Sequence, residues 1–296
     1  MSLEALAEMF AANGGVATTG ELLTVIFPKK LEVAVRGGKL IRLRRGVYAL
    51  KPPDLAARLA ALELASGMRI VACMQTPAEM WGFDTEPDSR LHILDPGIRM
   101  RPSPDVMVHQ RIGAPLRKIQ GRLATAPAWT AVEIGRTLRR PRALAVLDAA
   151  LHVECCSPAE LTAAVTEQKG RRGIVSVRAL VPLADGRAES PMESEVRLVF
   201  IDGGLPLPEL QFEIVDRHGK LWRVDFAWPD SKVVAEYESV EWHANPEGWK
   251  HDRMTTARLQ ECGWTTVPMV VDDVRKHPYE LVTRIFSHLE RGRIAG

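Results

Sequence analysis

Residues 28–50 read PKKLEVAVRGGKLIRLRRGVYAL and hold seven Lys and Arg residues against one acid, Glu32. The first apolar residues of this stretch recur at helical spacing, which predicts a helix from Pro28 to Gly37. From Lys39 the apolar period changes to two, which predicts two strands joined by a turn. The stretch therefore predicts a basic helix followed by a basic hairpin.

The residues before this stretch predict two further helices. The first is amphipathic from Leu3 to Phe10, and the second opens at Thr18, which has the spacing of a capping box with Glu21. Three helices followed by a basic hairpin are typical of a winged helix-turn-helix, which places a helix in a DNA groove. The predicted DNA-binding residues are the cations of the helix and hairpin: Lys29, Lys30, Arg36, Lys39, Arg42, Arg44 and Arg45. The alternative is a small helical subdomain with a solvated basic face.

Charge is distributed unevenly along the 296 residues, although the net charge is only +2. Residues 1–52 carry eight Lys and Arg against four acids, whereas residues 190–296 carry thirteen against eighteen. This gradient predicts double-stranded DNA as a partner of the first part and different chemistry in the last. The four cysteines suggest no zinc site or disulfide framework, and no signal peptide or membrane span is indicated. We expect a cytoplasmic protein with no membrane partner.

The alternation of helix and strand patterns predicts a multidomain chain of the α+β or α/β class. The predicted domains are a winged helix-turn-helix at 1–52, a mixed α/β region at 53–187 and a mixed sheet flanked by helices at 188–296. The basic run at 99–118 predicts a solvated strand–loop–strand element or, alternatively, a second contact with nucleic acid or a protein partner. The arginines around Pro141 are expected to end a helix there.

Further motifs lie in the first half of the chain. They are Arg-Arg-Gly-Val-Tyr at 44–48, TPAEMWG at 76–82 and an aliphatic segment at 124–150, in which a threonine-rich start is reduced to TAPA. Together they resemble AbiEi-type antitoxins of type IV toxin–antitoxin systems, over roughly residues 3–152. The resemblance implies a DNA-binding protein that represses its own operon and counteracts a toxin with a nucleotidyltransferase-like fold. DNA binding of this kind needs no cofactor.

Acidic residues follow a pattern in the predicted last domain. A helix is expected from Ser190, and its Glu193 either closes a capping box with Ser190 or serves as a metal ligand. Asp225 lies on a later strand, and Glu236 and Glu238 share one face of the next strand because strand side chains alternate. Carboxylates in this arrangement suit Mg²⁺, which can activate water for hydrolysis.

The segment at 223–243, RVDFAWPDSKVVAEYESVEWH, is similar to the very-short-patch-repair branch of restriction-endonuclease-like proteins. The similarity implies a restriction-endonuclease-like mixed sheet flanked by helices. It also implies Asp225 and Glu236 as metal ligands, and Asp225, Glu236, Glu238 and His243 as catalytic residues. The chain has Glu238-Ser239 where the branch has Asp–Gly. It has no lysine in the place of the usual water-orienting base, for which His243 is the candidate.

These patterns support two hypotheses. In the first, which we favour, the chain is an antitoxin and autorepressor that binds operator DNA and a cognate toxin protein. In the second, it is a DNA endonuclease that the winged helix delivers to its substrate. Mg²⁺ is expected only in the second case.

Overall fold

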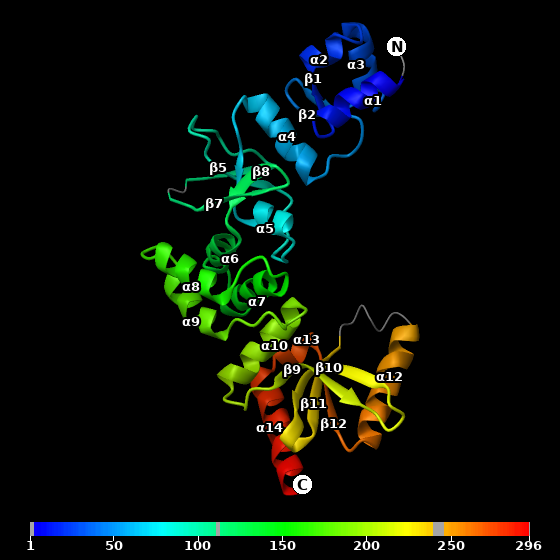
Figure 1. The fold of residues 1–296 in the computed structure, drawn as a ribbon, viewed down its shortest axis with the longest axis vertical. Coiled ribbons are helices and arrows are strands. Elements are labelled where there is room, and N and C mark those ends of the chain that lie inside the picture. The colour runs from blue at the N-terminus through cyan, green and yellow to red at the C-terminus, as the bar shows by residue number, and fades with distance from the viewer. Residues whose placement is uncertain (1–2, 111–112, 239–245, 296) are drawn as a thin grey trace. The chain divides into compact units, whose positions relative to one another are not determined.

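The computed structural model describes residues 3–110, 113–238 and 246–295. Over these residues the chain folds as two compact units. The first comprises the residues up to Pro77 together with Pro87–Ala126, and the second comprises Ala78–Glu86 and the residues from Pro127 onward. Both units mix helices with strands, so the expected α+β class is confirmed (Figure 1). The domain borders proposed from the sequence stay predictions.

Short helices alternate with the strands of a small sheet at the start of the first unit. In chain order these elements are α1 (Leu3–Ala12), β1 (Val16–Thr18), α2 (Thr19–Leu23), α3 (Pro28–Arg36), β2 (Ile41–Arg44), β3 (Val47–Ala49) and α4 (Leu55–Ser66). The sheet has the order β1-β3-β2 with antiparallel pairings. The predicted basic helix and hairpin are therefore present as α3 and β2–β3, whereas the prediction lacks β1.

The predicted capping box begins α2. Thr18 Oγ1 accepts the backbone N–H of Glu21 at 3.2 Å, and Glu21 Oε2 accepts the backbone N–H of Thr18 at 2.7 Å. The helix that follows buries Leu22 in a cluster with Phe10 and Leu31, which come from α1 and α3. Because the three helices share this core, the opposite face of α3 is left in solvent.

A mixed sheet follows in the first unit. Its strands are β4 (Val71–Ala72), β5 (Leu91–Leu94), β6 (Val106–His109), β7 (Leu116–Ile119) and β8 (Arg122–Thr125), in the order β6-β5-β4-β8-β7. The strand–loop–strand element expected at 99–118 corresponds to β6 and the start of β7, which lie at opposite edges. Helix α5 (Gln75–Trp81) runs across the border between the two units.

The second unit begins with a group of helices. They are α6 (Pro127–Gly135), α7 (Arg140–His152), α8 (Pro158–Glu167), α9 (Ile174–Leu180), the 3₁₀ turn η1 (Val181–Leu183) and α10 (Pro191–Asp202). The prediction that a helix ends at Pro141 is wrong, because Pro141 lies in the first turn of α7. Proline suits this position, since the first turn of a helix does not use its backbone N–H groups for internal hydrogen bonds.

The rest of the second unit is a mixed sheet with helices. Its elements are β9 (Glu209–Val215), β10 (Leu221–Trp228), the 3₁₀ turn η2 (Pro229–Ser231), β11 (Val233–Tyr237), α12 (Pro246–Glu261), β12 (Thr265–Met269), α13 (Val271–Arg275) and α14 (Pro278–Ala295). The strand order is β12-β11-β10-β9, with β12 parallel to β11 and the other pairings antiparallel. Helices α12 and α14 flank this sheet (Figure 1). The prediction lacks the short helix α13.

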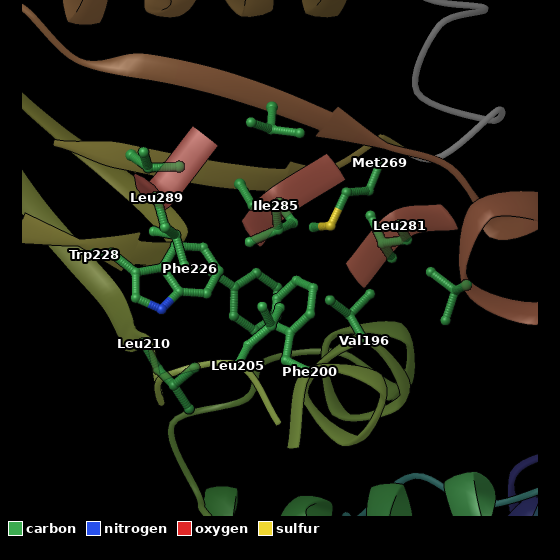
Figure 2. Packing of buried hydrophobic residues seen from close by; sticks show 14 residues of the cluster. Val196, Phe200, Leu205, Leu210, Phe226, Trp228, Met269, Leu281, Ile285 and Leu289 are labelled. Atoms are coloured by element: carbon green, nitrogen blue, oxygen red, sulfur yellow. The ribbon is translucent and has the colours of Figure 1, made fainter. Parts of the chain in front are cut away.

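Apolar side chains pack on both faces of this sheet. Figure 2 shows Phe200 of α10 against Phe226 and Trp228 of β10, with ring centroids 5.4 Å apart in each pair. Val224 instead packs with Leu259 of α12 in a separate cluster. Strict alternation would put Val224 and Phe226 on one face, so the strand changes face between them, at Asp225. The sheet therefore presents Asp225 at an irregular point of β10.

A buried ion pair joins α7 to α10. Arg197 Nη2 lies 2.6 Å from Asp148 Oδ2, and the two side chains are only 7% and 1% exposed. The other carboxylate oxygen of Asp148 accepts the backbone N–H of Asp185 at 2.8 Å. Arg197 also donates to the carbonyl of Leu183. The pair therefore fixes α10 and the turn before it to the preceding helices.

No helix among the described residues combines the length and apolar character needed to cross a lipid bilayer.

Candidate nucleic-acid interface and acidic cluster

The cations predicted to bind DNA lie on the outer face of α3 and on the hairpin β2–β3. The exposed members of this set are Lys29, Lys30, Arg36, Lys39, Arg42 and Arg45. Glu32 is the single acid of α3 and the hairpin. Its Oε2 lies 3.9 Å from Arg36 Nη2 in a solvent-exposed pair. Such a pair contributes little to stability, so Arg36 can exchange Glu32 for a phosphate at low cost.

Arg44 differs from the other predicted cations. Its guanidinium lies 2.6 Å from Asp105 Oδ2, and its side chain is only 20% exposed. A hydrogen bond from the Arg44 guanidinium, with a smaller contribution from its charge, lowers the pKa of the Asp105 carboxyl. Arg44 thus ties the hairpin to the loop before β6 within the first unit, and it is less available to a phosphate than Arg42 or Arg45. The residue type and its place in the hairpin gave no indication of this difference.

Apolar side chains accompany the cations of α3. Phe27, which precedes the helix, is 76% exposed, and Val33 is 63% exposed. The pattern of α3 predicts the outward position of Val33, but no sequence feature singled out Phe27. Exposed apolar groups beside a row of cations are suited to contact thymine methyl groups in a major groove.

The acidic cluster of the second unit centres on Asp225. Its Oδ2 accepts the backbone N–H of Tyr237 at 3.0 Å. Burial raises the pKa of the Asp225 carboxyl to about 6, and the negative charges of Glu193 and Glu189 add to this effect. The Tyr237 hydrogen bond and the Arg223 charge oppose it. Asp225 is therefore a carboxyl group whose charge is poorly compensated.

Glu193 does not close the expected capping box. Ser190 Oγ accepts the backbone N–H of Glu193 at 3.2 Å, as a cap requires. The carboxylate of Glu193, however, accepts the backbone N–H of Glu189 and the side-chain amide of Gln211, both at 2.9 Å. The capping-box interpretation of Glu193 is wrong, because a partner on β9 orients its side chain toward the sheet rather than back to Ser190.

The other predicted acids lie on or directly after β11. Glu236 and Glu238 are both partly buried. The predicted base His243 lies outside the described residues. Within the described part of the chain, no three His, Cys, Asp or Glu side chains are grouped so that they could hold a metal ion. The structure thus places Asp225 beside Glu193, and the role of the predicted metal ligands stays a prediction.

We expect Asp225→Asn to stabilise the protein at high pH. A carboxyl group with a folded-state pKa of about 6, above its ordinary value of 3.8, destabilises the fold once it is charged. The free energy of unfolding at pH 8 should rise by up to about 3 kcal/mol, whereas at pH 4 it should hardly change. The asparagine oxygen still accepts the Tyr237 N–H. Urea unfolding at both pH values measures the difference.

The matched control for this experiment is Asp230→Asn, since Asp230 is exposed in the turn after β10. It should change the stability by less than about 0.5 kcal/mol at either pH. Equal stabilities of Asp225→Asn and the natural protein at pH 8 would contradict the raised pKa.

Comparison with known proteins places the chain in a family. It is 59% identical over 268 residues to two proteins of Mycobacterium tuberculosis: uncharacterized protein Rv2248 of strain ATCC 25618 / H37Rv and uncharacterized protein MT2308 of strain CDC 1551 / Oshkosh. The alignment covers 90% of this chain and 99% of each relative. The chain belongs to the family of these two proteins. Residues 70–183 also match the family model of the AbiEi antitoxin C-terminal domain, which supports an AbiEi-type antitoxin.

The AbiEi domain extends further than the resemblance seen in the sequence, which ended near residue 152. Its matched range runs from β4 through η1 and so includes α8 and α9. The match does not cover the basic helix α3 or the hairpin. The antitoxin assignment and the DNA-binding prediction therefore rest on different parts of the chain.

A network of ion pairs surrounds an open pocket of about 1130 Å³ in the second unit. Arg142 Nε lies 2.5 Å from Glu86 Oε1, and Arg142 Nη1 lies 3.5 Å from Glu195 Oε1. Arg275 Nη2 lies 2.7 Å from the same Glu195 oxygen. Glu86 and Arg142 belong to the AbiEi domain, whereas Glu195 and Arg275 follow it. Sequence patterns do not predict this network, because they assign the arginines near Pro141 to the end of a helix. The lining holds Arg139, Arg142 and Arg275 against Glu86, Glu195 and Asp202, so the pocket carries little excess positive charge.

Proposed function

We propose that the protein is a DNA-binding antitoxin. It represses the operon of its own toxin–antitoxin system and neutralises a toxin with a nucleotidyltransferase-like fold. The observation that carries this proposal is the match of residues 70–183 to the AbiEi antitoxin domain. In this proposal the first elements of the chain hold operator DNA, and the AbiEi domain and the residues after it contact the toxin.

The order of the first elements supports a winged helix-turn-helix. Three helices with β1 inserted after the first are followed by the hairpin β2–β3, and β1 pairs with β3. In such a domain the last helix enters the major groove and the hairpin contacts the phosphate backbone. Helix α3 would then present Val33 and its lysines to the groove, and Arg42 and Arg45 would contact phosphates.

A salt titration tests DNA binding. Binding of the natural protein to duplex DNA from upstream of its own gene should weaken steeply as the salt concentration rises. The variant with Lys29, Arg42 and Arg45 changed to Ala should bind more weakly at each salt concentration. Because each lost phosphate contact removes about 0.9 from the slope of log K against log salt, the slope should fall by about two to three.

The control removes an equal charge elsewhere, at Lys169, Arg172 and Arg178, which are exposed in and around α8 and α9. Its slope should equal that of the natural protein. An equal loss of affinity in the two triple variants would mean that binding follows net charge alone, and would contradict the proposed interface. The ratio of the affinities for the upstream DNA and for scrambled DNA of the same length measures the preference for the operator.

Neutralisation of a toxin is tested separately. The toxin gene beside this one should arrest growth when expressed alone, and co-expression of this protein should restore growth. Restoration by the Lys29, Arg42 and Arg45 variant would show that the antitoxin activity does not require the basic face. Failure of the natural protein to restore growth would overturn the antitoxin proposal while leaving DNA binding intact.

A second candidate function is metal-dependent hydrolysis of DNA. The specific observation in its favour is Asp225, which lies on a strand of a mixed sheet flanked by helices. Its negative charge is poorly compensated, and the Glu193 carboxylate of α10 is close to it. Carboxylates are the right donors for Mg²⁺, and a divalent cation would neutralise the charge that burial disfavours. Asp225 and Glu193 are the residues that would hold it.

Incubation with supercoiled plasmid and Mg²⁺ or Mn²⁺ tests this candidate. Nicking by the natural protein that is lost in Asp225→Asn would support an endonuclease. An intact plasmid at every metal concentration, or equal nicking by both proteins, would contradict it.

A further inference from the structure

Two adjacent cysteines lie in the turn between α7 and α8. Cys155 and Cys156 follow Glu154, whose backbone is left-handed with a φ of 54°. Both sulfurs turn toward a single acceptor, since the carbonyl oxygen of Ala150 lies 3.2 Å from Cys155 Sγ and 3.8 Å from Cys156 Sγ. The turn thus brings two thiol groups to the same point at the end of α7.

The thiols also contact each other. A hydrogen bond from the Cys156 thiol lowers the pKa of Cys155, and the same contact together with burial raises the pKa of Cys156. Cys155 therefore loses its proton more readily than Cys156 and is the better nucleophile of the two.

Both cysteines line an open pocket of about 500 Å³, formed with the turn around Asp185 and Gly186. Cys155 is partly exposed, while Cys156 is 9% exposed. A small reagent can therefore reach Cys155 from solvent and then meet Cys156.

A disulfide between these residues is disfavoured by geometry. Consecutive Cα atoms are about 3.8 Å apart, whereas disulfides usually join Cα atoms about 4.4–6.8 Å apart. A bridging atom between the sulfurs lengthens the link and relieves this restriction. Both sulfurs lie against one carbonyl oxygen and interact with each other, so a bridging atom with bent coordination suits them better than a linear S–metal–S arrangement. Soft ions are the ones that thiolates select.

We propose that Cys155 and Cys156 form a two-thiol binding site for a soft, thiophilic ion of bent geometry, with trivalent arsenic as the representative species. In the reaction with phenylarsine oxide, two arsenic–sulfur bonds form and the arsenic–oxygen bonds break. The two thiol protons leave with the oxygen as one water molecule, and arsenic stays trivalent throughout. The proposal does not depend on the antitoxin function.

Intact-mass measurement of the folded protein with phenylarsine oxide tests the site. One phenylarsine group should add per chain, with loss of one water. 2,3-Dimercaptopropanol should remove it, whereas 2-mercaptoethanol at the same thiol concentration should not. The variants Cys155→Ser and Cys156→Ser, each with a single thiol left, should bind the arsenical about a hundredfold more weakly.

The matched control is Cys262→Ser, which removes a partly exposed cysteine that has no neighbouring thiol in sequence. It should bind like the natural protein. A second measurement requires no variant: the natural protein should form the adduct in native buffer as well as in urea. An adduct that forms only in urea would overturn the proposal, because the folded turn would then close the site. Loss of the adduct in Cys262→Ser would overturn it as well.

Discussion

Replacing Asp148 by Ala is expected to lower the free energy of unfolding by about 3–5 kcal/mol. The substitution removes the only anion of a buried pair and leaves the Arg197 guanidinium inside the protein without a counter-charge. The nearby Asp185 carboxylate is already paired with Arg187, and among the described residues the buried Nε of Arg197 has no hydrogen-bond partner. The backbone N–H of Asp185 also loses its acceptor. Urea unfolding at pH 7 measures the loss.

Two further variants separate the causes of this loss. The exposed pair of Asp272 and Lys276 serves as the control, and Asp272→Ala should cost less than about 0.5 kcal/mol because solvent screens the pair. The double variant Asp148→Leu, Arg197→Met should be more stable than Asp148→Ala, since it leaves no unpaired charge. A double variant that is less stable than Asp148→Ala would show that the pair matters through its packing rather than through its charge.

Replacing Gly173 by Ala is expected to destabilise the protein by about 3 kcal/mol or more. Gly173 caps the N-terminus of α9 with a φ of 82°, a conformation that costs an L-residue about 1–2 kcal/mol. A Cβ atom at this position would in addition overlap the backbone carbonyl oxygen of Arg136. Backbone cannot move aside as a side chain can, so α6 and α9 would have to separate. Urea unfolding measures this effect as well.

Gly170 provides the control for Gly173. Its φ is 85°, but a Cβ atom there would meet no atom of the described residues within 4 Å. Gly170→Ala therefore carries only the conformational cost, and the difference between the two variants measures the close approach. Equal effects of the two substitutions would contradict the overlap.

Two pairs with the same spacing show what the sequence can and cannot predict. Thr18 with Glu21 and Ser190 with Glu193 both fit the capping-box pattern, yet only the first forms the complete box. The first is predictable because its partners lie within one helical turn of each other. In the second, Gln211 binds the glutamate from a strand that is distant in sequence. Local patterns cannot anticipate such a partner.

In the basic hairpin, too, the strands are predictable from local patterns, whereas the partners of their side chains are not. Residues 28–50 predict α3 and both strands, because the change from helical to alternating spacing is a local property. Arg42 and Arg44 alternate in the same strand and look equivalent in the sequence. Only the fold brings Asp105 to Arg44 and leaves Arg42 in solvent. The cations that can bind phosphate are thus fewer than the pattern indicated.

The change of face at Asp225 is also a tertiary effect. The alternation of apolar residues in β10 is regular enough to predict a strand, and the acid within it is visible. The sequence contains no sign that Val224 and Phe226 pack on opposite faces, because this depends on α12 and α10 covering the two sides. The position of Glu193 beside Asp225 follows from the same packing.

The ion pair between Asp148 and Arg197 has a consequence for the gain and loss of domains in this family. Asp148 lies within the AbiEi domain and Arg197 lies after it. A shortened chain that ended at the last residue of the AbiEi match would lose α10, and with it both the cation that pairs with Asp148 and the packing against α7. The segment after the AbiEi match therefore completes the surroundings of a residue inside that match, and the two parts of the chain depend on each other for stability.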